Sequence, residues 1–210
     1  MSDIAITVSG TKRLLTAGKR HDKNIVITAE GGDHYYDTFW DSYQLNGTRT
    51  NYRYAFYSQN SGVWTDDLYA PKYPIIATGS YGGDSVFQNS LITDTKVDIE
   101  IGINASYTFI SCYNLKTIRK LIVSENTTFN RWFGGCGALE NVTFDGVIAS
   151  DISFSDSTKL TNASVQSVID HLKDLTGLTS QTLTLHEYVA NALTDTQKAA
   201  ITAKNWTLVY

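Results

Sequence analysis

The sequence predicts an α+β protein built as a short β-solenoid with irregular rungs, a small N-terminal β unit and a helical C-terminal cap. The main observation is a repeat. Phe, Cys, Leu and a β-branched residue occur twice in that order, at 109, 112, 115 and 118 and again at 133, 136, 139 and 142. A repeat of this length is typical of solenoids, in which each unit buries its apolar side against its neighbour. Strand-like alternation at the start of the chain and helical periodicity at its end indicate the other two parts.

The predicted repeats occupy residues 85–160. A looser unit begins at Phe87 and ends in a strand over 97–101, where apolar and acidic residues alternate. A decayed unit begins at Phe154, and there Ser157 stands at the position of the cysteine. The array is therefore expected to be short and uneven in spacing.

Cys112 and Cys136 occupy equivalent positions of two neighbouring repeats. Adjacent strands lie about 4.8 Å apart, so a disulfide is geometrically conceivable. A column of two buried, reduced thiols is the favoured interpretation, because a small apolar side chain suits a packed repeat and the cytosol keeps thiols reduced.

Residues 1–31 are expected to form an N-terminal β docking unit, with strands over 4–8, 14–15 and 24–28 and a break at 31–32. The rest of the chain, 32–210, is assigned to the solenoid. Within it, four aromatic residues at helical spacing predict a capping helix over 34–45. Such a helix would cover the apolar end of the stack.

Residues 161–210 are predicted to form the C-terminal cap. Thr161 is expected to open a helix that ends near Gly177, with the core face at 165, 168, 169 and 172. A strand over 182–185 follows. A capping-box spacing at 194–197 opens a second helix, which extends to about residue 204, and a last strand covers 206–209.

Composition argues against several functions. The 210 residues carry a net charge of −4, and the basic residues are scattered, which does not suit a nucleic-acid groove. No window is apolar enough for membrane insertion, and no signal-peptide pattern precedes the first strand. We therefore expect synthesis in the cytoplasm and no contact with nucleic acid.

No residue pattern predicts catalysis, a cofactor or a metal site. The four histidines are far apart, and none stands in a zinc-binding arrangement. Asp98 and Glu100 share one face of a strand and could form an acid–base pair or half of a Ca²⁺ site. The favoured interpretation is simpler: the apolar residues between them face the core, and both carboxylates face water.

The candidate contact surface combines outward strand positions with an aromatic-rich segment. Tyrosine suits such surfaces, because its ring can be buried while its hydroxyl stays in water. The candidate residues are Tyr52, Tyr54, Tyr57, Trp64, Tyr69, Tyr81, Asp98, Glu100 and Arg119.

The pattern Phe-x-x-Cys-x-x-Leu-x-x-Ile/Val, complete at 109–118 and 133–142, resembles the BspA-type leucine-rich repeats of bacteria and their phages. In addition, residues 11–30 look like a leader of tail-associated proteins from phages and prophages of Gram-positive gut bacteria. The helix at 39–41 and the ends at 183–185 and 205–208 look similar to leucine-rich-repeat proteins from that source. The resemblance implies a leucine-rich-repeat-like solenoid and supplies no catalytic residues.

The resemblance implies a non-enzymatic structural protein of a virion, in the tail, baseplate or fibre, with a solenoid face that binds protein or glycan and serves host attachment. Its partners would be other tail proteins and a host surface protein or glycan, and a homo-oligomer is compatible with this role. Two alternatives stay open. One is a bacterial cell-surface adhesin, which the missing signal peptide disfavours. The other is a glycan-acting enzyme, which would need a carboxylate pair facing a cleft.

Overall fold

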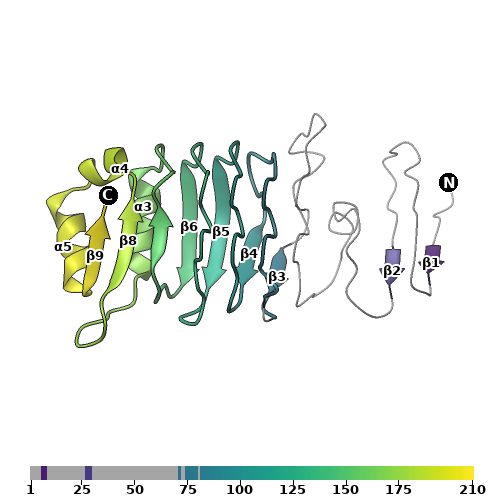
Figure 1. Cartoon of the computed structure of the whole chain (residues 1–210), viewed down its shortest axis with the longest axis horizontal. Helices are drawn as coiled ribbons and strands as arrows, with labels where there is room; N and C mark the ends of the chain where they lie inside the picture. Colours follow the sequence, from purple (N-terminus) through teal and green to yellow (C-terminus); the bar gives the residue numbers. More distant parts are fainter. Residues whose placement is uncertain (1–5, 9–26, 30–70, 72–73, 80) are drawn as a thin grey trace.

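The computed structural model describes residues 6–8, 27–29, 71, 74–79 and 81–210 (Figure 1). The chain is a mixture of strands and short helices, as predicted, and its strands form parallel sheets. The predicted strand over 14–15, the helix over 34–45 and almost all of the aromatic segment 50–80 lie outside the described residues.

Two short strands are described near the N-terminus. Strand β1 (Ile6–Val8) pairs in parallel with β2 (Ile27–Ala29), with Ile6 opposite Ile27. Both overlap the strands predicted over 4–8 and 24–28.

The largest sheet contains four strands in chain order: β3 (Ile75–Ala77), β4 (Asp98–Ile101), β5 (Thr117–Val123) and β6 (Asn141–Gly146). Every pair is parallel. The register aligns one buried apolar residue from each strand, in the row Ile75, Ile99, Leu121 and Phe144. Successive sequence units therefore pack with equivalent residues side by side.

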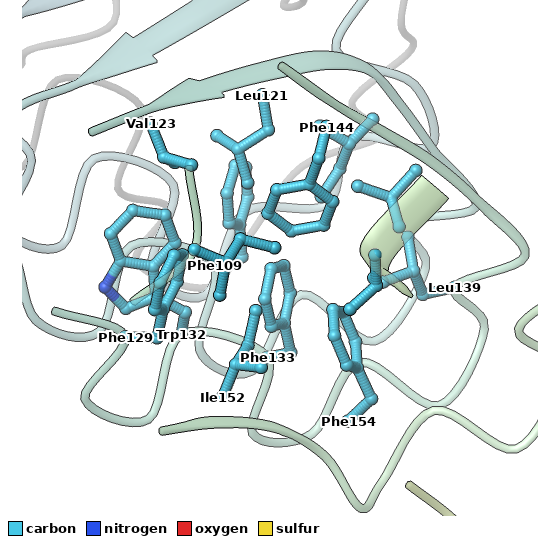
Figure 2. Packing of buried hydrophobic residues seen from close by; sticks show 14 of the residues in the cluster. Phe109, Leu121, Val123, Phe129, Trp132, Phe133, Leu139, Phe144, Ile152 and Phe154 are labelled. Atoms are coloured by element: carbon cyan, nitrogen blue, oxygen red, sulfur yellow. The ribbon is translucent and has the colours of Figure 1, made fainter. Parts of the chain in front are cut away.

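A column of stacked phenylalanines forms the centre of the core (Figure 2). The ring of Phe109 stacks on Phe87 and on Phe133, with centroid distances of 5.2 and 5.8 Å. Phe133 in turn stacks on Phe154 at 4.4 Å. All four side chains are buried. The prediction that Phe87 and Phe154 occupy the same position as the two clear repeats is confirmed.

A regular hydrogen-bond ladder joins the turns that carry these rings. The N–H groups of Phe87 and Asn89 donate to the carbonyls of Thr108 and Ile110. One unit later, the N–H groups of Phe109 and Ser111 donate to the carbonyls of Trp132 and Gly134. The residues two places before and after each ring have left-handed backbones in all three units: 85 and 89, 107 and 111, 131 and 135. The repeat is therefore as regular in backbone conformation as in sequence.

Cys112 and Cys136 are buried and unlinked, as the favoured interpretation predicted. Each thiol donates to the carbonyl of the phenylalanine in the preceding unit: Cys112 Sγ to Phe87 at 2.9 Å and Cys136 Sγ to Phe109 at 3.1 Å. Burial, with the neighbouring Cys136, raises the pKa of the Cys112 thiol well above its ordinary range. Burial also raises the pKa of Cys136 to about 12.

We expect these thiols to make the protein less stable at high pH. The unfolded chain releases its thiol protons near pH 8.5, whereas the folded chain holds them until about pH 12 at Cys136. The unfolded state therefore binds fewer protons in this window, and each thiol lowers the free energy of unfolding by up to about 1.4 kcal/mol per pH unit. Urea denaturation at pH 7.5, 8.5 and 9.5 measures the slope. The double variant Cys112→Ser, Cys136→Ser should be less sensitive to pH, and equal slopes would contradict the assignment.

Helix α3 (Asn162–His171) covers the free edge of β6. The hydroxyls of Ser164 and Ser167 accept the N–H groups of Val142 and Phe144, at 3.0 and 2.9 Å. These hydroxyls take the place that the carbonyls of a fifth strand would occupy. The helix thus satisfies the edge donors and prevents further pairing there.

The predicted end of this helix near Gly177 is wrong, although its core face is buried as expected. The helix ends at His171, because Leu172 turns to an extended backbone and forms a parallel bridge with Ile148. The Lys204 ammonium group then binds the carbonyls of Ile169, Asp170 and Leu172 at the end of the helix, where the Leu172 N–H also donates to the Ile169 carbonyl.

A three-stranded parallel sheet completes the chain. Its strands are β7 (Ile152–Phe154), β8 (Gln181–Leu185) and β9 (Trp206–Val209). Helices α4 (Glu187–Asn191) and α5 (Asp195–Ala203) lie between β8 and β9 in sequence. The capping box at Thr194 and Gln197 is present as predicted. Strand β7 and helix α4 were not predicted, because each is too short to show a clear period.

Candidate contact surface

Four of the nine predicted contact residues lie in the described part of the chain: Tyr81, Asp98, Glu100 and Arg119. The other five, Tyr52, Tyr54, Tyr57, Trp64 and Tyr69, lie outside it. The Tyr81 side chain is 55% exposed and belongs to a turn closed by a hydrogen bond from the Gly82 N–H to the Gly79 carbonyl. Asp98, Glu100 and Arg119 lie together on β4 and β5.

The outward position of these three residues follows from strand geometry. On and before β4, Val97, Ile99 and Ile101 are buried as predicted, and successive side chains of a strand point to opposite faces. On β5, a register shift between Ile118 and Leu121 inserts one extra residue relative to β6. This bulge sets Arg119 and Lys120 in succession between two buried positions.

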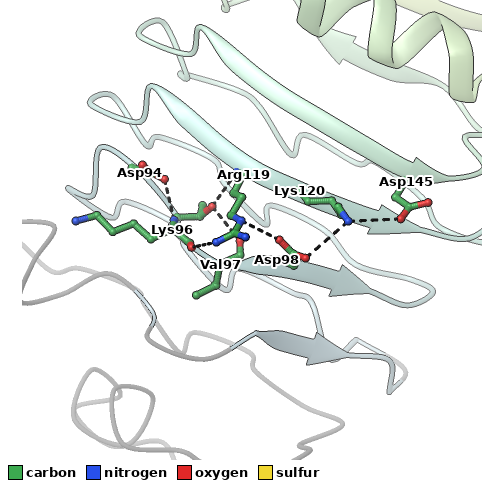
Figure 3. Close-up of polar contacts among 8 residues, drawn as sticks. Asp94, Lys96, Val97, Asp98, Arg119, Lys120 and Asp145 are labelled. Atoms are coloured by element: carbon green, nitrogen blue, oxygen red, sulfur yellow. Dashed lines mark hydrogen bonds and ion pairs between the residues drawn. The ribbon is translucent and has the colours of Figure 1, made fainter.

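Asp98 is the centre of a chain of ion pairs on this face (Figure 3). Its carboxylate lies 3.3 Å from Arg119 Nε and 3.8 Å from Lys120 Nζ. Lys120 Nζ also lies 3.9 Å from the carboxylate of Asp145 on β6. The Asp98 side chain is 34% exposed, so it is shared between cations and water and does not extend freely into solvent.

Arg119 is held to the preceding unit at two further points. Its N–H donates to Thr95 Oγ1 at 3.1 Å, and its guanidinium donates to the Lys96 carbonyl at 3.2 Å. The side chain is nevertheless 66% exposed, which leaves guanidinium surface for a partner. This alternating pattern of charge can bind a complementary polar surface, although each exposed pair adds little to stability.

A second candidate site is a groove beside β7 that is lined mostly by polar residues and has a volume of about 480 Å³. One side is formed by 128–130, the middle by 150–153, and the other side by Gln181, Thr182 and Thr184 of β8. This groove was not predicted from the sequence, because its three segments are far apart in sequence and each looks like an ordinary turn or strand. The one available signal was the alternation of threonines with the buried leucines of β8, Leu183 and Leu185.

Across the described ranges, no group of three or more His, Cys, Asp or Glu side chains could hold a metal ion. None of the helices in those ranges is long and apolar enough to cross a membrane. Comparison with known proteins found no match for this chain among family models, curated proteins or solved structures.

Proposed function

We infer that this protein is a non-enzymatic structural component of a phage or prophage virion, in the tail, baseplate or fibre. Its stacked units form a short leucine-rich-repeat-like solenoid whose outward face binds protein or glycan during host attachment. Residues 1–31 dock the solenoid to other tail proteins. The chain is made in the cytoplasm and reaches the outside as part of the particle.

The observation that carries the proposal is the alignment of equivalent residues in successive units. Phe87, Phe109, Phe133 and Phe154 stack in one column. The parallel strands β3 to β6 lie side by side in the order in which they occur in the sequence. Inward residues of such an array hold the stack together, while outward residues can vary without disturbing the core. This division suits an attachment protein, whose contact face has to match its receptor.

The outward face of β4 to β6 offers the chemistry for such contacts. Asp98, Arg119, Lys120 and Asp145 alternate in charge across three strands and remain partly exposed. Complementary charges of this kind set orientation and partner choice more than affinity. The face is therefore suited to selective recognition.

The test is the location of the chain in bacteria that carry its gene. We expect particles induced from such cells and purified on a density gradient to contain the chain, as detected by mass spectrometry. Immunogold labelling should place it at the tail. Recovery only in the cell-envelope fraction would favour the adhesin alternative, and absence from both fractions would reject any attachment role.

A further inference from the structure

We propose that the groove beside β7 is a binding site for a neutral saccharide. The proposal rests on the proposed function, since it names the ligand class for an attachment protein. At the groove the backbone hydrogen-bond ladder between units is interrupted, although the rings of Phe133 and Phe154 remain stacked. The ladder from unit to unit extends as far as 130–134, and in the described part of the chain no backbone hydrogen bond then joins 128–133 to β7.

Both ends of this interruption are closed, so the groove has fixed walls. At one end, Ser150 Oγ donates to the Thr127 carbonyl at 2.7 Å. At the other end, the Gly135 N–H donates to the Asp156 carboxylate at 2.6 Å, next to the stacked rings of Phe133 and Phe154. Between these two closures the segments separate and leave polar side chains facing solvent.

The polar groups at the centre are held in place before any ligand arrives. The Asp151 N–H donates to Gln181 Oε1 at 3.1 Å, and the Thr182 N–H donates to Asp151 Oδ1 at 2.6 Å. These two hydrogen bonds hold Asp151 in place, the second through Oδ1 of its carboxylate, and leave Oδ2 available to a ligand. Across the strand pair, Ser153 lies opposite Thr184, which adds two hydroxyls on the same face. Fixed donors and acceptors reduce the entropy lost on binding.

The chemistry of the lining selects a neutral, hydroxyl-rich ligand. No Lys, Arg or His lines the groove, and Asp151 contributes a negative charge, so an anion would be repelled. A divalent cation such as Ca²⁺ binds six to eight oxygen atoms, usually from several carboxylates, whereas Asp151 is the one carboxylate that lines the groove. A protein partner would favour exposed aromatic or arginine side chains, whereas the one aromatic residue here, Phe129, is buried. Sugar hydroxyls match the side-chain hydroxyls and carboxylate, and sugar C–H groups match the threonine methyls.

The experiment uses the full chain on an array of immobilised oligosaccharides. Neutral probes contain glucose, galactose, mannose or N-acetylglucosamine, and anionic probes are sialylated or sulfated. The strongest neutral probe is then titrated by calorimetry. Thr182→Val and Thr184→Val each remove one hydroxyl and keep the β-branched shape, and each is expected to weaken binding about 3- to 10-fold. Thr128→Val tests the opposite wall in the same way.

Thr143→Val is the matched control, because Thr143 is an exposed strand threonine of β6 that does not line the groove. We expect it to bind like the wild type. Binding of no saccharide, preference for anionic probes, or neutral binding that none of the three groove variants weakens would each overturn the inference. A chain found in the particle that binds no saccharide overturns this inference alone. A chain that binds saccharides but is absent from particles overturns only the proposed function.

Discussion

Phe133→Ala is expected to lower the free energy of unfolding by about 3–5 kcal/mol, the usual cost of truncating a buried aromatic ring. Phe133 stacks against Phe109 on one side and against Phe154 on the other. Its removal leaves a cavity that interrupts the column between two neighbours. The turn around it is bound to adjacent units by hydrogen bonds, so it can collapse only in part. Urea denaturation followed by circular dichroism measures the loss.

Two variants show whether the loss comes from the column. Phe133→Leu retains most of the buried volume and should lose less than half as much. Tyr188→Ala removes a similar ring from a mostly exposed position and should change stability by no more than about 0.5 kcal/mol. A loss below about 1 kcal/mol for Phe133→Ala would mean that the stack contributes little to folding.

The parts of the fold that sequence could predict are those in which the same residue type returns to the same environment. The phenylalanine column was recognisable at 109 and 133, and it extended to Phe87 and Phe154 although those spacings are shorter. Uneven spacing is tolerated, because turns and the bulge in β5 absorb the difference while the buried positions stay aligned. The end of α3 could not be predicted, because it depends on a bridge to Ile148 that is remote in sequence.

In the candidate contact surface, too, features set by neighbouring residues could be predicted, and features set by residues remote in sequence could not. Strand alternation was enough to predict that Asp98 and Glu100 leave the core. It could not predict that Asp98 binds Arg119 and Lys120, because those partners depend on the register of β4 against β5. The groove beside β7 was unpredictable for a stronger reason, since it is formed by three segments remote in sequence, at a place where the backbone hydrogen bonds between units stop.

Gly146→Ala is expected to lower the free energy of unfolding by about 3 kcal/mol or more, from left-handed strain together with a backbone clash. Gly146 ends β6 with φ +89°, in the region that side chains rarely occupy. A Cβ there would lie 1.9 Å from the carbonyl oxygen of Val123. That carbonyl accepts the Val147 N–H, so relief of the clash would separate β5 from β6 at this end. Urea denaturation at neutral pH measures the loss.

Two other glycines separate the two contributions. Gly177 has φ +77° but open space around its Cβ position, so Gly177→Ala should show the conformational cost alone, about 1–2 kcal/mol. Gly137 has neither a left-handed backbone nor a close neighbour, because the nearest atom to its Cβ position is the Asp156 carbonyl oxygen at 3.6 Å. Gly137→Ala should therefore be neutral or slightly stabilising. If Gly146→Ala cost no more than Gly177→Ala, then β5 and β6 would not be in close contact at Val123 and Gly146. That result would contradict the tight packing of neighbouring units described above.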